Sequence, residues 1–294
     1  MSLNMTQKGP DNKKKLVGLI GRPVKHSVSS DVHNAAFNYL NLEYFYIAFE
    51  VKEDALRSAV IGLKALEATG FNVTIPYKQK VVKFLDKLVD DARTIKAVNT
   101  VVIKKGKMIG YNTDVPGVIN ALIPYKDMLS GCDALILGAG GGASAAALAL
   151  AKLGCNRITF VSRTPSKARR LADFFKQRIK ISTDSLGLSA SNLSNIAKPY
   201  GIIINATPVG MWPNSDSSLL RREHIRSGSI VMDMVYNPIE TVLLKEARLA
   251  GAFCVSGLDM LVFQAAESFR LWTSLEPPIE VMKRAAIEAL GRFS

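Results

Sequence analysis

The sequence has few of the residues that bind metal ions in proteins. Among its 294 residues there are three cysteines and three histidines. The cysteines show no metal-binding spacing, and their odd number is typical of a protein kept in a reducing compartment. We therefore predict no metal site and a cytoplasmic location.

An apolar leader is also absent, since the first fifteen residues are largely polar. Residues 134–151 carry no charge, and this run is long enough to suggest a membrane span. Four glycines in its first half and Lys152 directly after it argue against a span. The sequence predicts neither secretion nor contact with a membrane.

Acidic residues are outnumbered by basic ones, and the formal net charge is +13. A basic chain can attract nucleic acid. Here, however, the charge is spread along the chain apart from two short clusters, and no zinc-finger or RNP signature is present. We expect no nucleic acid partner, because an anionic cofactor and an anionic small-molecule substrate would use part of this charge.

Length and composition favour two α/β domains, because 48% of the residues are hydrophobic and strand-type runs alternate with helical stretches. Two helical stretches, 258–274 and 279–291, end the chain with no strand after them. We expect these helices to return to the first domain. The predicted division is a substrate-binding domain of residues 1–115 plus 258–294 and a Rossmann-like, doubly wound nucleotide-binding domain of residues 116–257.

Three local patterns give more detailed predictions. Apolar residues from Val81 to Val89 predict a helix that starts after Pro76. Asp31 is expected to cap a helix over residues 33–40. In the second domain, residues 179–183 are predicted to form a strand.

The stretch from Ala134 to Val161 has the order strand, glycine turn, helix, strand. In that order, Gly-x-Gly-x-x-Gly/Ala indicates a dinucleotide-binding unit. The glycines let backbone N–H groups approach a pyrophosphate, and the helix N-terminus favours its negative charge. The residues predicted to contact the cofactor are Gly138, Ala139, Gly140, Gly141 and Gly142.

The end of the second strand indicates which cofactor is used. Enzymes that use NAD place a carboxylate there for the ribose hydroxyl, whereas a 2′-phosphate is met by Arg and Lys. No acidic residue occurs between Arg157 and Asp173. NADP is therefore predicted, although a solvated basic helix face would also explain the later basic residues. The predicted phosphate contacts are Ser162, Arg163, Thr164 and Lys167.

A dehydrogenase needs a group that moves the proton on the substrate oxygen. The Tyr-x-x-x-Lys pattern of short-chain dehydrogenases is absent from this sequence. Lys78 follows a predicted strand, and Asp114 lies at the predicted domain junction. By charge type alone, each is typical of a solvated surface residue.

Several motifs in one order cover most of the chain. They are HSVS (26–29), VHNAAF (32–37), GFNVTIPYK (70–78), AVNT (97–100), GYNTD (110–114), GAGG (138–141), NATPVGM (205–211), DMVY (233–236) and residues 257–264. Together they closely resemble the shikimate dehydrogenase family.

The resemblance implies an enzyme that interconverts 3-dehydroshikimate and shikimate with NADPH and NADP. Lys78 and Asp114 are implied as the catalytic pair. The implied substrate contacts are Ser27, Ser29, Thr74, Asn99, Tyr236 and Gln264, and further implied cofactor contacts are Thr207, Met234 and Gly257.

Several residues depart from the family pattern and affect the expected loop shapes, including an extra glycine at Gly142 and alanines at 145 and 146 where a basic residue is frequent. Ser30 replaces a common Pro, Lys96 a common Gly, and Asp259 a frequent second Gly.

Two alternative functions make different predictions about the sequence. A quinate/shikimate dehydrogenase that uses NAD would carry an acidic residue after the second strand, and a catalytically silent NADP sensor or nucleic-acid binder would have lost the lysine or the aspartate. Neither change is present; monomer and homodimer both stay open.

Overall fold

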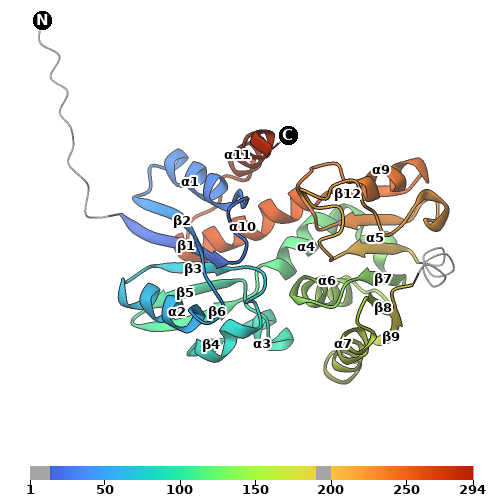
Figure 1. The fold of residues 1–294 in the computed structure, drawn as a ribbon, viewed down its shortest axis with the longest axis horizontal. Coiled ribbons are helices and arrows are strands. Elements are labelled where there is room, and N and C mark those ends of the chain that lie inside the picture. The colour runs from blue at the N-terminus through green and yellow to red at the C-terminus, as the bar shows by residue number, and fades with distance from the viewer. Residues whose placement is uncertain (1–13, 190–199, 294) are drawn as a thin grey trace, which may run out of the picture.

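The computed structural model describes residues 14–189 and 200–293, so most of the polar N-terminal tail lies outside the described residues. Two six-stranded sheets are joined through α4 (Asp114–Leu122) and α10 (Gly257–Thr273), which pack against each other between the sheets (Figure 1). The predicted two-domain α/β architecture is confirmed.

The first sheet has the strand order β2-β1-β3-β5-β6-β4. Its strands are β1 (Lys15–Gly21), β2 (Tyr44–Glu50), β3 (Gly70–Val73), β4 (Lys87–Leu88), β5 (Thr100–Lys104) and β6 (Lys107–Tyr111). Side chains alternate between the two faces of β1. Val17 and Leu19 pack toward α1 (Ser29–Tyr39), whereas Ile20 packs toward α2 (Leu56–Ala65).

The second sheet has the order β12-β11-β10-β7-β8-β9, and all of its paired strands are parallel. Its strands are β7 (Asp133–Leu137), β8 (Arg157–Ser162), β9 (Ser182–Gly187), β10 (Ile202–Asn205), β11 (Ile230–Asp233) and β12 (Phe253–Val255). This is the doubly wound order, in which successive strands are added on one side of β7 up to β9 and then on its other side from β10. The loops after β7 and β10 diverge and leave room for a ligand.

Helices cover both faces of the second sheet. The longer ones are α6 (Gly141–Lys152), α7 (Pro165–Arg178) and α9 (Val242–Leu249). The short helical segments of the described chain are η1 (Lys80–Phe84), α3 (Asp90–Ile95), η2 (Ile123–Tyr125), α5 (Lys126–Leu129), η3 (Arg222–His224) and η4 (Gly291–Phe293). Across residues 14–189 and 200–293, every helix is too short or too polar to span a bilayer.

The C-terminal helices pack on the first sheet. Residues of α10 and α11 (Ile279–Leu290) share one hydrophobic core with α1 and with Val17 and Tyr46 of the first sheet. Figure 1 shows α11, in red, beside α1, in blue. The boundaries near residues 115 and 257 stay predictions.

The helix predicted after Pro76 is wrong. Residues 80–84 form only a short 3-10 segment, and the chain then becomes extended as β4. The reason is a nonlocal pairing, because the N–H groups of Asp86 and Val89 donate to Met108 and Gly110, respectively, along β6. Apolar residues that suggest a helix face therefore line an edge strand.

Two other boundaries differ from the prediction. The predicted strand at 179–183 begins later, as β9, because α7 continues to Arg178 and Ile179 caps it. The first helix starts at Ser29, so Asp31 lies in its first turn and is not its cap. There it pairs with Arg292 near the C-terminus.

Candidate functional site

Lys78 and Asp114 form a close ion pair between the first sheet and α4. Lys78 Nζ lies 2.6 Å from Asp114 Oδ2, and the two side chains are 18% and 4% exposed. The Val98 N–H donates to the Lys78 carbonyl over 2.7 Å, which fixes the lysine backbone beside the Ala-Val-Asn-Thr segment. A pair this well shielded from water interacts strongly, and removing one partner leaves an uncompensated charge.

The position of Asp114 follows from the local fold. Strand β6 ends at Tyr111, and Asp114 begins α4 three residues later. A carboxylate in the first turn of a helix is stabilised by the free N–H groups and the helix dipole. The first turn of α4 is therefore a suitable place for a carboxylate that pairs with an ammonium group.

A chain of side-chain hydrogen bonds extends from this ion pair. Asn99 Nδ2 lies 2.9 Å from Asp114 Oδ1 and 3.3 Å from Gln264 Oε1. Asn99 follows Val98 on the approach to β5, and Gln264 lies on α10. The three polar residues and Lys78 therefore form one connected cluster, although they are separated by up to 186 positions in the sequence.

A second group of hydroxyls surrounds the loop before α1. Ser27 Oγ donates to Ser29 Oγ over 3.1 Å. Burial raises the pKa of Tyr236, while the neighbouring Ser27 hydroxyl acts in the opposite direction. Burial likewise raises the pKa of Tyr46, against the influence of Ser29. Hydroxyl donors gathered in one place suit a carboxylate ligand.

Thr74 directly follows β3 and lies in the same region of the first sheet. Its N–H donates to Ile20 O over 3.0 Å. Its side chain packs against Gly21, where an added Cβ would lie only 2.2 Å from Thr74 Cγ2. The residue is partly exposed. Thr74 therefore lies beside the start of the loop that leads to Ser27 and Ser29.

The glycine turn has the geometry that a dinucleotide needs. Gly138 has φ +121°, and a Cβ there would lie 2.9 Å from Ala206 O. Gly140 caps the N-terminus of α6 in extended backbone, and a Cβ added to Gly140 would have no other atom within 4 Å. The loop after β10 faces the same turn, and there Thr207 hydrogen-bonds to Asn205 over 2.7 Å. Backbone N–H groups at the start of α6 are therefore open to an anion.

The catalytic candidates and the glycine turn meet. A Cβ at Gly141 would lie 3.5 Å from Lys78 Cβ, and one at Gly142 would lie 3.3 Å from Met234 Cε. A Cβ at Gly257 would lie 2.5 Å from the carbonyl oxygen of Val235. These contacts bring Lys78 of the first domain against the nucleotide loop of the second.

Asp233 holds the segment that carries Met234 and Tyr236. Its carboxylate accepts from Thr241 Oγ1 over 2.7 Å and from Asn205 Nδ2 over 2.9 Å. Burial raises the pKa of Asp233 to about 6, and these hydrogen bonds act in the opposite direction. The carboxylate thus ties β11 to the end of β10 and to the start of α9.

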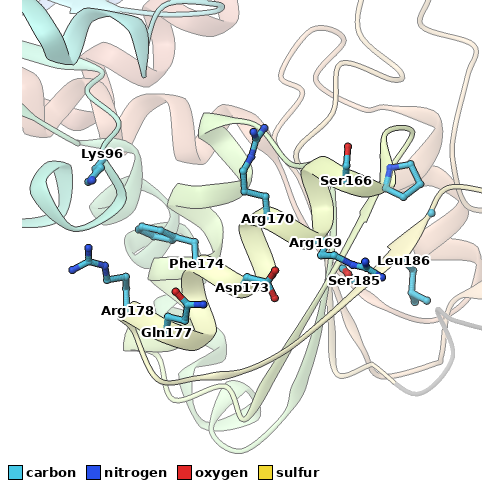
Figure 2. A pocket seen from close by; sticks show the side chains of 12 residues that line it. Lys96, Ser166, Arg169, Arg170, Asp173, Phe174, Gln177, Arg178, Ser185 and Leu186 are labelled. Atoms are coloured by element: carbon cyan, nitrogen blue, oxygen red, sulfur yellow. The ribbon is translucent and has the colours of Figure 1, made fainter.

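The predicted phosphate contacts lie at the end of β8, in the turn that follows it and in the first turn of α7. Ser162 is partly buried, while Arg163, Thr164 and Lys167 are exposed. Next to this turn, a groove of about 830 Å³ runs along α7, with Lys96 at its far side (Figure 2). Its lining contains four cations and one carboxylate, so it adds positive charge beside the predicted phosphate site: Lys96, Arg169, Arg170, Arg178 and Asp173. The groove does not include Lys78 or Asp114.

Four buried polar residues near the site were not predicted from the sequence. Asn72, Thr100, Thr113 and Ser268 connect to one another at 2.8–3.1 Å. Tyr46 donates to Asn72 Oδ1 over 2.8 Å. A polar Asn in the apolar strand β3 was one available signal. A second was the four-residue spacing of Gln264 and Ser268, which places both on one face of a helix.

Three of the residues that depart from the family pattern have local explanations. Lys96 has φ +51°, a left-handed conformation in which glycine is favoured. Asp259 lies in the first turn of α10 and pairs with Lys283 at 2.7 Å. Ser30 lies in the first turn of α1. None of the three disrupts the polar cluster around Asp114.

Two α/β domains, with a lysine–aspartate pair against a glycine turn, define the class of nucleotide-dependent oxidoreductases. The chain belongs to the shikimate dehydrogenase family. Residues 19–101 match the shikimate dehydrogenase substrate binding domain, residues 124–231 match shikimate / quinate 5-dehydrogenase, and residues 257–287 match the shikimate 5′-dehydrogenase C-terminal domain.

Individual relatives agree with this assignment. A shikimate dehydrogenase (NADP(+)) from Methanococcus maripaludis is 45% identical over 276 residues, covering 94% of this chain and 97% of the relative. A crystal structure of a shikimate dehydrogenase with NADP⁺ is 44% identical, with a TM-score of 0.88, and covers 95% of this chain and 97% of that one. A shikimate 5-dehydrogenase from Listeria monocytogenes, solved with shikimate and NAD, is 34% identical, with a TM-score of 0.85, and covers 93% and 96% of the chains.

Proposed function

We propose that this protein catalyses the reversible NADPH-dependent reduction of 3-dehydroshikimate to shikimate, a step in the biosynthesis of chorismate and aromatic amino acids. The observation that carries the proposal is the connected cluster of Lys78, Asp114, Asn99 and Gln264 beside the glycine turn. This cluster combines a proton donor with neutral polar groups for hydroxyls, and it lies where a nucleotide is expected to bind.

Lys78 acts at the oxygen of the ketone. NADPH, when bound, supplies the hydride to the carbonyl carbon. The Lys78 ammonium stabilises the negative charge that develops on oxygen and gives it a proton. Asp114 keeps the ammonium oriented and accepts a hydrogen bond from a neighbouring substrate hydroxyl. In the oxidative direction, the same lysine takes the proton back.

The remaining candidates hold the substrate. Ser27 and Ser29 bind the ring carboxylate, because their hydroxyls lie together where the loop enters α1, beside Tyr236. Polar groups around the ring contact its hydroxyls; they are Thr74, Asn99, Tyr236 and Gln264. Neutral donors and acceptors of this kind recognise a polyhydroxylated ring without adding fixed charge.

The cofactor residues divide into three groups. Backbone groups from Gly138 through Ala139, Gly140 and Gly141 to Gly142 bind the pyrophosphate, and Thr207 faces them from the loop after β10. The 2′-phosphate is bound by Ser162, Arg163, Thr164 and Lys167. Met234 and Gly257 lie on the nicotinamide side. The residues present fit NADP, because the glycine turn admits a close backbone approach and exposed cations lie in the turn after β8 and at the start of α7.

The substrate domain comprises residues 1–115 with 258–294, and the NADP domain comprises residues 116–257. The protein is a monomer or a homodimer, and its location is the cytoplasm. Size-exclusion chromatography with light scattering distinguishes the two oligomeric states.

A steady-state assay with four combinations tests the function: shikimate or quinate, each with NADP or NAD. We expect the highest kcat/KM for shikimate with NADP. The quinate and NAD alternative requires the opposite ranking, and a silent NADP-binding protein would show no turnover in any combination.

Substitution of Lys78 tests the mechanism. Lys78→Ala should lower kcat by about 10² to 10⁴, with a much smaller change in KM, because the ammonium interacts most strongly with the charge formed in the transition state. Lys80→Ala is the matched control, since Lys80 is an exposed lysine on the same segment, paired with Glu53. Near wild-type kcat in a folded Lys78→Ala protein that binds NADP would contradict the mechanism.

A further inference from the structure

Two thiols at the base of the second sheet lie within reach of each other. Cys132 Sγ and Cys155 Sγ are 3.6 Å apart, and both cysteines are free. Cys132 directly precedes β7, and Cys155 lies just before β8, its parallel neighbour. The pair therefore lies at the amino ends of these strands, whereas the glycine turn lies at their carboxyl ends.

Backbone hydrogen bonds hold both thiol-bearing turns. The Asn156 N–H donates to Cys132 O over 2.8 Å, and the Gly131 N–H donates to Gly154 O over 2.8 Å. Gly201 makes room beside the pair, because a Cβ there would lie only 2.8 Å from Cys132 Cβ. The closeness of the two sulfurs is thus fixed by the main chain, not by flexible side chains alone.

The two thiols are suited to different roles. The hydrogen bond between them lowers the pKa of Cys132, and the same bond together with burial raises the pKa of Cys155. Cys132 is partly exposed, whereas Cys155 is buried. A thiolate that reaches solvent is the better nucleophile, and a buried neighbouring thiol can resolve the mixed disulfide that forms.

We propose that Cys132 and Cys155 form a reversible dithiol–disulfide pair that exchanges with small disulfides such as oxidised glutathione. The Cys132 thiolate attacks one sulfur of glutathione disulfide, the S–S bond breaks, and one glutathione thiolate leaves. Cys155 gives its proton to solvent and attacks the Cys132 sulfur, which forms the Cys132–Cys155 bond and releases the second glutathione. Two protein thiols are oxidised, and one glutathione disulfide is reduced to two thiols.

The cross-link is compatible with the native fold. The sulfur–sulfur distance has to shorten from 3.6 Å to about 2 Å. It joins residues 23 positions apart and so restricts the unfolded chain. The disulfide stabilises the second domain. It leaves the Lys78–Asp114 pair unchanged, because that pair lies against the glycine turn at the opposite end of the strands.

Treatment of the native full-length protein with oxidised glutathione tests the proposal. Peptide mapping without reduction should recover a Cys132–Cys155 cross-linked peptide, which disappears after dithiothreitol. The oxidised protein should have a Tm higher by on the order of 5 °C, and its shikimate oxidation rate should be unchanged. Cys254 is the internal control, since its thiol bonds to backbone carbonyls and not to another thiol.

A trapping variant separates the two roles. Cys155→Ala should retain one glutathione on Cys132, and Cys132→Ser should take up none at Cys155. If Cys155→Ala does not fold, acid quenching of the wild-type reaction at early times should reveal the same mixed disulfide on Cys132. A stable glutathione adduct on wild-type Cys132 that never resolves, or cross-links that involve Cys254 instead, would overturn the proposal.

Discussion

His33 is a fully buried side chain in the core shared by α1, α10 and α11. Its ring stacks on Tyr46 with 4.5 Å between centroids, and among the described residues neither ring nitrogen has a hydrogen-bond partner. Burial lowers the pKa of His33 from 6.5 to about 3. The imidazole therefore stays neutral in the folded protein at pH values where the unfolded chain binds a proton.

This difference predicts a loss of stability in mild acid. Between pH 6.5 and about 3, the unfolded state holds one more proton at His33, so stability falls as pH falls, by up to about 1.4 kcal/mol per pH unit. His33→Phe keeps an aromatic ring and removes the proton site. Urea unfolding at pH 7 and pH 5 should show that the wild type loses about 2 kcal/mol more than the variant over this interval. Equal losses would mean that His33 is not buried in its neutral form.

Arg163 provides a test of cofactor choice. Arg163→Ala should weaken NADP binding by about 2 kcal/mol, or roughly 30-fold in Kd, because it removes a charge-assisted contact to the 2′-phosphate. NAD, which lacks that phosphate, should bind almost unchanged. Arg178→Ala at the far end of α7 is the control, and isothermal titration calorimetry measures the affinity of the wild type and of each variant for both cofactors. Equal losses for both cofactors would show that Arg163 does not contact the phosphate.

At the residue scale, the sequence predicts the residues of local motifs better than it predicts the buried polar residues that support them. Lys78 and Asp114 each belong to a recognisable motif, and the structure brings them to 2.6 Å. Asn72 and Ser268 also lie in or beside such motifs. Their partnership, however, exists only because β3 and α10 fold together across 196 positions, and no spacing pattern encodes that contact.

At the scale of elements, predictions succeed where short-range pattern decides the structure. Strand β7, its glycine turn, α6 and β8 follow one another locally, and all were predicted. Strand β4 has two residues and exists only through its pairing with β6, so its apolar residues were mistaken for a helix face. A period of apolar residues shows that a segment is buried, but not which partner covers it.

Two glycines within elements provide a matched test of this packing. A Cβ at Gly257 would lie 2.5 Å from Val235 O and 2.7 Å from Asp233 O, whereas Gly62 in the middle of α2 has nothing within 4 Å. Gly257→Ala should destabilise the protein by about 1–3 kcal/mol through overpacking. Gly62→Ala should stabilise it by about 0.5–1 kcal/mol by lowering the entropy of the unfolded chain. Chemical denaturation measures both, and a neutral Gly257→Ala would contradict the close approach of α10 to the Asp233 loop.

At the scale of the whole molecule, the two domains meet through contacts of different kinds. The junction of α4 and α10 is tight, because a Cβ at Gly117 would lie 2.9 Å from Gln264 Cβ. At the rim, the His26 ring from the substrate loop meets the Trp212 ring from the second domain with 4.7 Å between centroids. A rigid junction and an aromatic contact between exposed loops suit hinged domains, with the hinge at the helices and the closing contact at the rim.

We therefore expect ligands to favour the closed arrangement. Shikimate and NADP contact different domains, so their joint binding should lower the radius of gyration in small-angle scattering relative to the unliganded protein. Trp212→Ala removes the rim contact, worth about 0.5–1.5 kcal/mol for an aromatic pair, and should raise the KM for shikimate about two- to tenfold with a smaller effect on kcat. Trp212→Phe keeps an aromatic ring and should retain most of the wild-type KM. Superimposable scattering profiles with and without ligands, together with an unchanged KM in Trp212→Ala, would show that the domains do not move as hinged bodies.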